Sequence, residues 1–142
     1  LDPLPPIVPV FLNLVEEPFP TPKRCLAWGH MIRDAIESYP EDIRVAVLST
    51  GGLSHSIGEA TMGWIDEPFD QACINLFKSA SDSKLASELD RMMAVTGNGG
   101  AELRTWSIAH AAAGGQGFEL IDYTPLPEIL IGCGLAEWKI AA

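Results

Sequence analysis

Two short apolar runs flank a stretch with helical spacing in the first third of the chain. Ile7–Leu14 and Ile43–Ser49 are rich in aliphatic and β-branched residues, which is typical of β-strands, and a proline inside the first run favours an edge position. Between them, Pro22 suits the first turn of a helix and Pro40 stops one, which predicts a helix over residues 22–38. The order strand, helix, strand predicts a right-handed parallel crossover.

Helical patterns dominate the next part of the chain. Pro68 opens a helix that runs to about Lys78, and Ser81 or Ser83 can cap a further one. The apolar face of that further helix consists of Leu85, Leu89, Met92 and Met93. Strong helix formers then predict a helix over residues 101–113, after a glycine-rich turn.

The C-terminal part contains a shorter β-like run. Phe118–Tyr123 reads as a short strand, and Pro125 and Pro127 predict an irregular segment after it. Residues 56–67 have no clear period and are expected to form a loop. The whole pattern predicts one α/β domain over residues 1–142, with a central mixed or mainly parallel sheet flanked by helices.

The strand-like run that ends at Ser49 is followed by two glycines and then by a histidine. Gly51 and Gly52 permit backbone angles that other residues resist, so the strand is expected to break there. Ser54 and His55 then stand just beyond the carboxyl end of a buried strand. Ligands of open α/β sheets bind at that edge, which makes His55 a candidate for chemistry.

Composition narrows the range of partners. The chain has 142 residues, 47% of them hydrophobic, which suits one domain with its own core. Its net charge of −10 would repel nucleic acid and anionic membranes. It has no run of 18 apolar residues and no basic secretion signal, so we expect a soluble, cytoplasmic protein. Because it begins with leucine, it is expected to be a fragment or a processed product.

The remaining candidates for chemistry have simpler interpretations. Cys25, Cys73 and Cys133 are widely spaced and form no CxxC pattern, so they are expected to be buried free thiols. His30 and His110 fall inside predicted helices and are expected to be ordinary helix residues. The four tryptophans could line an aromatic pocket but are more typical of a core.

Several motifs, in order, resemble one enzyme family over essentially the whole chain. The run Thr50–His55, with the sequence Thr-Gly-Gly-Leu-Ser-His, resembles the type III extradiol ring-cleavage dioxygenases. Further landmarks resemble the C-terminal half of their catalytic subunit, typified by the protocatechuate 4,5-dioxygenase beta chain; they are Pro6–Val10, Pro20–Cys25, Gly63–Asp70, Gly97–Trp106 and Asp122–Pro127.

This resemblance implies a non-haem Fe(II) enzyme that opens a catechol-type ring with O₂ beside its two hydroxyls. The family holds its iron with two histidines and one glutamate, a facial triad that leaves positions open for catecholate and dioxygen. By the match of Gly-Ala-Glu-Leu-Arg-Thr-Trp, Glu102 stands at the glutamate ligand. By the match of Gly-Gly-Leu-Ser-His, His55 stands at the catalytic acid/base, a role that suits an imidazole near neutral pH.

The two histidine ligands of the family lie in an N-terminal half that has no counterpart in these 142 residues. Three interpretations follow: another chain supplies the rest of the site, the chain derives from a larger precursor, or it is an inactive relative. The alternative function is a non-catalytic fragment or assembly subunit that retains His55 and Glu102 as relics. In either case the apolar run Ile7–Leu14 would expose a sheet edge, which predicts an oligomer or a companion chain.

Overall fold

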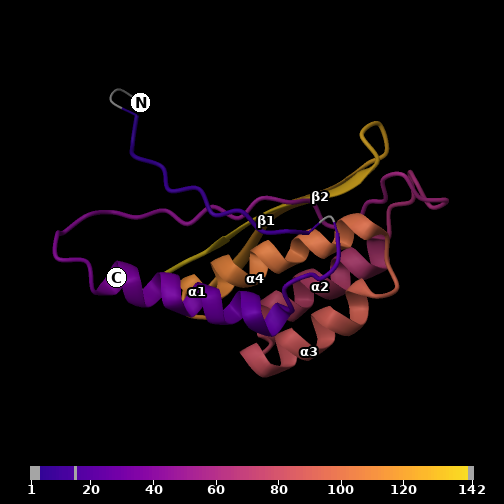
Figure 1. Cartoon of the computed structure of the whole chain (residues 1–142). Helices are drawn as coiled ribbons and strands as arrows, with labels where there is room; N and C mark the ends of the chain where they lie inside the picture. Colours follow the sequence, from indigo (N-terminus) through magenta and orange to yellow (C-terminus); the bar gives the residue numbers. More distant parts are fainter. Residues whose placement is uncertain (1–3, 15, 141–142) are drawn as a thin grey trace.

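The computed structural model describes residues 4–14 and 16–140, which contain four α-helices and one β-hairpin (Figure 1). A short 3₁₀ helix, η1, leads directly into the last α-helix. The elements are α1 (Pro22–Glu37), α2 (Glu67–Ser79), α3 (Asp82–Met93), η1 (Asn98–Glu102), α4 (Leu103–Ala112), β1 (Phe118–Leu126) and β2 (Ile131–Trp138). In this described part, no helix is both long and apolar enough to cross a membrane.

The starts of α1 and α2 follow from local capping and from proline in the first turn. The Thr21 side chain accepts a hydrogen bond from the Arg24 N–H at 3.2 Å, with Pro22 in the first turn of α1. The Asp66 carboxylate accepts from the Phe69 N–H at 3.1 Å at the start of α2. The predicted helices at 22–38 and from Pro68 to about Lys78 are therefore confirmed to within one residue at each end.

The core is centred on Phe77, which α2 places between α4 and the hairpin. Its ring centroid lies 5.8 Å from that of Trp106, 5.9 Å from that of Phe118 and 6.0 Å from that of Trp138. Leu85 and other apolar residues of α3 join the same buried cluster. Aromatic packing of this kind ties α2, α4 and both strands into one unit.

The C-terminal segment is a strand rather than the irregular segment that the prolines predict. β1 continues past the predicted Tyr123 to Leu126 and pairs antiparallel with β2, with Pro125 opposite Gly132. Proline is tolerated there because a two-stranded sheet consists only of edge strands, where one missing N–H need not break a pair. The sequence did not predict this second strand because glycine, at positions 132 and 134, has a low β-propensity and adds no side chain to the alternating pattern.

The two N-terminal apolar runs are extended but belong to no sheet. Neither 7–14 nor 43–49 is assigned as a strand, and the described residues contain only the antiparallel β1–β2 pair. Their side chains stand in solvent: Val8 is 87% exposed and Leu48 86%. A strand needs a hydrogen-bonded neighbour, and none is present in residues 4–14 and 16–140. The α/β class is confirmed, whereas the central parallel sheet is not shown.

Replacement of Phe77 by alanine tests the centre of this core. Because the ring is 2% exposed and touches aromatic groups from three other elements, Phe77→Ala should lower the free energy of unfolding by about 3–5 kcal/mol. Urea unfolding followed by circular dichroism measures this change. Phe11→Ala is the control, since Phe11 is 89% exposed and its loss should cost less than about 0.5 kcal/mol. Equal effects of the two variants would contradict the assignment of the core.

Candidate active site

The loop after the second apolar run passes close to η1. Gly51 has φ +132°, and a Cβ added there would lie 2.7 Å from the Cβ of Glu102. Only glycine combines this backbone conformation with so close an approach. The next N–H, of Gly52, donates a 3.0 Å hydrogen bond to Oε2 of Glu102. The predicted glycine break is therefore where the loop meets the predicted metal ligand.

His55 lies at the end of this loop and is nearly buried, with 8% of its surface exposed. Its carbonyl accepts a hydrogen bond from the Gly99 N–H at 3.1 Å, and its backbone forms an isolated bridge with Ile131. The imidazole lies directly against Gly99, where an added Cβ would overlap the ring. Contacts from η1 and from β2 thus fix the position of the side chain.

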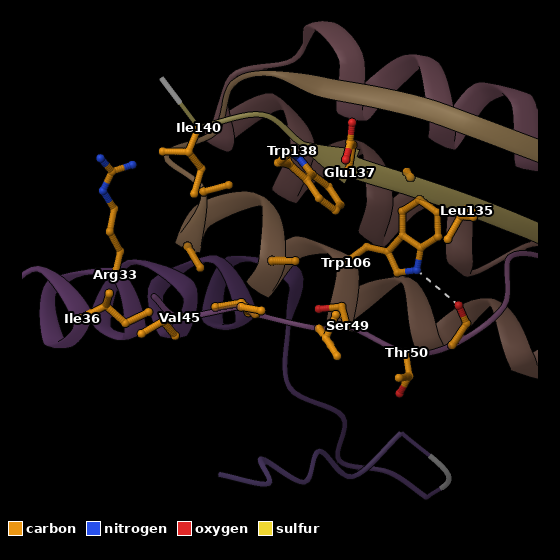
Figure 2. A pocket seen from close by; sticks show the side chains of 18 of the residues that line it. Arg33, Ile36, Val45, Ser49, Thr50, Trp106, Leu135, Glu137, Trp138 and Ile140 are labelled. Atoms are coloured by element: carbon orange, nitrogen blue, oxygen red, sulfur yellow. Dashed lines mark hydrogen bonds between the residues drawn. The ribbon is translucent and has the colours of Figure 1, made fainter. Parts of the chain in front are cut away.

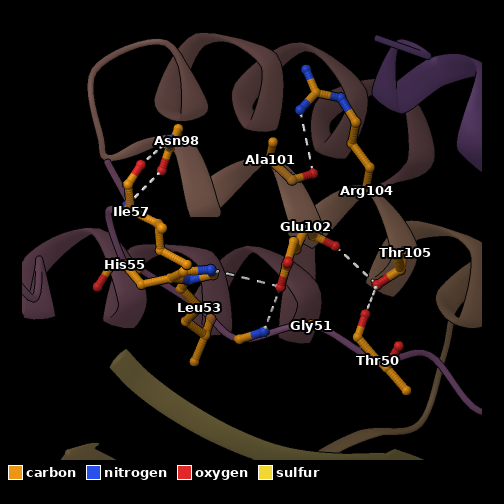
Figure 3. Close-up of polar contacts among 12 residues, drawn as sticks. Thr50, Gly51, Leu53, His55, Ile57, Asn98, Ala101, Glu102, Arg104 and Thr105 are labelled. Carbon is orange, nitrogen blue, oxygen red and sulfur yellow. Dashed lines mark hydrogen bonds and ion pairs between the residues drawn. The ribbon is translucent and has the colours of Figure 1, made fainter. Parts of the chain in front are cut away.

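The hydrogen bonds of His55 determine which ring nitrogen is free. Nδ1 lies 3.2 Å from the carbonyl oxygen of Leu53, which can only accept, so Nδ1 carries the proton in this contact. In the neutral ring, Nε2 then keeps its lone pair. Nε2 lies 3.9 Å from Oε2 of Glu102 (Figure 3). A basic nitrogen and a carboxylate therefore face the same small region.

Glu102 is the last residue of η1 and immediately precedes α4. The sequence placed it in the first turn of an α-helix; the structure places it in a 3₁₀ turn instead, because the chain is already helical from Asn98. The side chain is 39% exposed, so solvent or a ligand can reach its carboxylate. Thr105 Oγ1 lies 2.9 Å from the Glu102 carbonyl and 2.8 Å from that of Thr50, which links η1 to the loop a second time.

A buried carboxylate that the sequence did not single out lies on the other side of the loop. Asp70 of α2 accepts hydrogen bonds from the Ser54 N–H at 2.7 Å, the Ser54 hydroxyl at 2.9 Å and the Tyr123 hydroxyl at 2.7 Å. Burial raises the pKa of Asp70, although these donors oppose the shift. Asp70 ends the Gly63–Asp70 motif, but no periodicity in the sequence predicts its contact with Ser54.

The other two histidines lie at the junction of α1, α3 and α4. His30 Nε2 is 2.6 Å from Oδ2 of Asp82, and its side chain is half exposed. His110 is 1% exposed, and its Nδ1 accepts a 3.0 Å hydrogen bond from the Trp138 indole N–H. Both are helix residues that pack or pair structurally, as the sequence predicts.

The described residues contain no cluster of side chains that would hold a metal ion by itself. Across 4–14 and 16–140, no group of three or more His, Cys, Asp or Glu side chains is arranged to hold a metal ion. Glu102 contributes one accessible carboxylate, which suits a hard cation.

The three cysteines do not join Glu102 in a metal-binding cluster. Cys25 and Cys73 are buried free thiols, as predicted, and burial raises the pKa of Cys25 to about 11, whereas Cys133 is an exposed free thiol, contrary to the prediction.

A separate apolar groove of about 690 Å³ lies between α1, α4, β2 and the extended segment 45–51 (Figure 2). Trp106 and Trp138 form part of its wall, and Arg33 lies toward one end. Neither His55 nor Glu102 lines it. The groove therefore contains neither of the two predicted site residues and is not the candidate reaction site.

Comparison with known proteins identifies relatives of the chain. A family profile described as "Catalytic LigB subunit of aromatic ring-opening dioxygenase" matches residues 3–130. A gallate dioxygenase of Pseudomonas putida is 35% identical over 102 residues, which cover 72% of this chain and 30% of the relative. A 2,3-dihydroxyphenylpropionate/2,3-dihydroxicinnamic acid 1,2-dioxygenase of Mycolicibacterium paratuberculosis is 32% identical over 174 residues, covering 89% of this chain and 55% of the relative.

A protein of the same description from Rhodococcus rhodochrous is 25% identical over 186 residues, covering 96% of this chain and 57% of the relative. The chain thus spans about a third to somewhat over half of the length of these relatives. The last two alignments are longer than the 142 residues of this chain, so both relatives contain additional residues within the matched span.

The buried His110 predicts a pH dependence of stability. Burial lowers its pKa below the ordinary 6.5, and this effect outweighs the neighbouring Asp82 carboxylate, while His30 acts in the same direction as burial. Folding therefore favours the neutral ring, and the stability that it contributes is present above pH 6.5 and lost as the pH falls through the folded-state pKa.

Urea unfolding between about pH 7 and pH 5 should accordingly show stability falling by at most about 1.4 kcal/mol per pH unit from this one group. His110→Gln should flatten that dependence, because glutamine can still accept from Trp138 but does not titrate. An unchanged slope in His110→Gln would contradict this account.

Proposed function

This chain belongs to the family of catalytic LigB subunits of aromatic ring-opening dioxygenases, and we propose that it forms part of an extradiol enzyme that opens a catechol-type ring with O₂. The observation that carries the proposal is the pairing of His55 Nε2 with Glu102 Oε2 at 3.9 Å, from residues 47 positions apart in the sequence. The family match covers both residues. The relatives include gallate and dihydroxyphenylpropionate dioxygenases, which supports a small dihydroxylated aromatic acid as substrate.

His55 is the acid/base in this proposal. With Nδ1 held by the Leu53 carbonyl, Nε2 is the nitrogen that can take a proton from a substrate hydroxyl and later return it. The same nitrogen can serve in both directions, because it accepts a proton through its lone pair and donates once it is protonated. The near burial of the ring limits competition from bulk water for that proton.

Glu102 is the proposed ligand of Fe(II), the cofactor that the family resemblance implies. When bound, Fe(II) supplies open coordination positions at which a catecholate and O₂ can meet. The Gly52 N–H orients the carboxylate by binding Oε2, which leaves the rest of the carboxylate available to a cation. His55 is close enough to serve a substrate held at that position.

Two histidine ligands must come from outside the described residues. We propose that a further part of the polypeptide or a companion chain supplies them and also pairs with the extended segments 7–14 and 43–49, completing a central sheet. The large solvent exposure of these apolar segments supports this proposal. Free rather than disulfide-bonded cysteines favour a reducing compartment, and we place the protein in the cytoplasm.

A non-catalytic assembly role is the second candidate. It is favoured by one observation, namely that residues 4–14 and 16–140 contain no three-ligand cluster. The two candidates differ in what happens when the complete protein is loaded with Fe(II). An enzyme consumes O₂ with catechols, whereas an assembly subunit with relic residues neither binds iron stoichiometrically nor consumes O₂.

Glu102→Gln tests the metal ligand. An amide coordinates a hard cation weakly, so the variant of the complete, Fe(II)-loaded protein should lose most of its iron on desalting. Iron per protein is measured by elemental analysis. Glu119→Gln is the matched control, since Glu119 lies on the exposed side of β1 and pairs with Lys139. Equal iron content in the wild type and Glu102→Gln would refute the ligand role.

His55→Ala tests the acid/base and should give the opposite pattern. Iron should remain bound while O₂ uptake with a catechol slows by ~10²-fold or more, as for loss of a general acid/base. His30→Ala provides a control, because His30 is half exposed and pairs with Asp82 away from the site. Loss of iron in His55→Ala, or full turnover without the imidazole, would overturn this assignment.

A further inference from the structure

Asp70 is a completely buried carboxylate that directs two of its three hydrogen bonds to a single residue, Ser54. Removal of a carboxylate from water costs free energy, and an apolar side chain of similar size would often serve stability as well. Ser54 immediately precedes His55, so Asp70 binds the residue next to the imidazole.

A short chain of contacts runs from Asp70 to the imidazole. Asp70 binds both the N–H and the hydroxyl of Ser54. On the opposite side, the Leu53 N–H donates to the Gly132 carbonyl at 2.9 Å, and the Gly132 N–H donates to the Ser54 carbonyl at 2.8 Å. Asp70 thus holds the peptide between residues 53 and 54 through the Ser54 N–H, while the two bonds to Gly132 hold the adjoining peptides on either side. The carbonyl oxygen of the peptide between residues 53 and 54, that of Leu53, is the acceptor for His55 Nδ1.

Contact between Asp70 and β2 leaves this arrangement little freedom. A Cβ added at Gly132 would overlap Oδ2 of Asp70, so the strand and the carboxylate are already in contact. The Tyr123 hydroxyl closes the remaining side by donating to the same oxygen. Displacement of the carboxylate would therefore disturb the backbone of the loop.

We propose that Asp70 is a positioning residue for His55: acting through Ser54, it orients the Leu53 carbonyl so that His55 stays protonated at Nδ1 and presents Nε2 toward Glu102. The catalytic consequence of this role rests on the proposed function. The orientation itself does not, because it needs neither metal nor substrate.

The tautomer of His55 is the direct readout. Long-range ¹H–¹⁵N correlation spectra of the ¹⁵N-labelled protein at about pH 8 distinguish the two tautomers of a neutral imidazole. Wild-type His55 should show the Nδ1–H pattern. His110 should show the Nε2–H pattern, because its Nδ1 accepts from Trp138, and it serves as an internal reference.

Asp70→Asn keeps the size of the side chain but replaces one acceptor oxygen with a donor. The His55 signals should move to a mixture of the two tautomers while those of His110 stay unchanged. Ser54→Ala removes the hydroxyl link and should change His55 in the same direction, so it carries the test if Asp70→Asn does not fold. Tyr123→Phe leaves both Ser54 bonds in place and should retain the wild-type pattern.

Unchanged His55 signals in both Asp70→Asn and Ser54→Ala would overturn the proposal, as would an equal change in Tyr123→Phe. Turnover of the complete iron-loaded protein separates this proposal from the proposed function. A fall in kcat of Asp70→Asn at unchanged KM and iron content supports both the positioning role of Asp70 and the acid/base role of His55. A tautomer change with unaltered kcat supports the positioning role and contradicts the acid/base role of His55.

Discussion

The close approach of the Gly51–Gly52 loop to η1 is the constraint on which the rest of the site depends. A side chain at Gly51 would meet Glu102, and one at Gly99 would overlap the imidazole of His55. Because both positions lack a Cβ, two segments distant in sequence come within hydrogen-bonding range. The bond from Gly52 to Glu102 and the bond from Gly99 to His55 then fix their relative position. Nε2 of His55 and the Glu102 carboxylate are neighbours for this reason.

The helices and the hairpin provide the rigid support that this approach needs. Through Phe77, α2 packs against α4 and both strands, and through Asp70 it binds the loop itself. Helix α2 therefore contributes Phe77 to the apolar core and Asp70 to the hydrogen bonds that hold the loop. Contacts made by rigid elements hold functional groups more accurately than a free loop can.

The parts of the structure that local chemistry determines were predictable from the sequence. Helix starts at Pro22 and Pro68 follow from capping and from proline geometry, and the motifs at Gly51–His55 and around Glu102 identified the pair that the structure brings together. The strand β2 was missed because its glycines carry no side-chain signal, and Asp70 was missed because its partners come from distant segments. Segments 7–14 and 43–49 have strand patterns, but pairing requires a neighbour that these residues do not include.

The proposed function connects the exposed apolar segments with the accessible carboxylate of Glu102, because it assigns both the sheet partners and the remaining metal ligands to residues outside the described part of the chain. A crystal structure of the complete iron-loaded protein, with anomalous difference density recorded at the iron absorption edge, tests the central claim most directly. The account predicts an iron peak bonded to the Glu102 carboxylate, with His55 Nε2 facing it beyond bonding distance. An iron peak remote from Glu102, or a direct bond from His55 to the iron, would contradict the account.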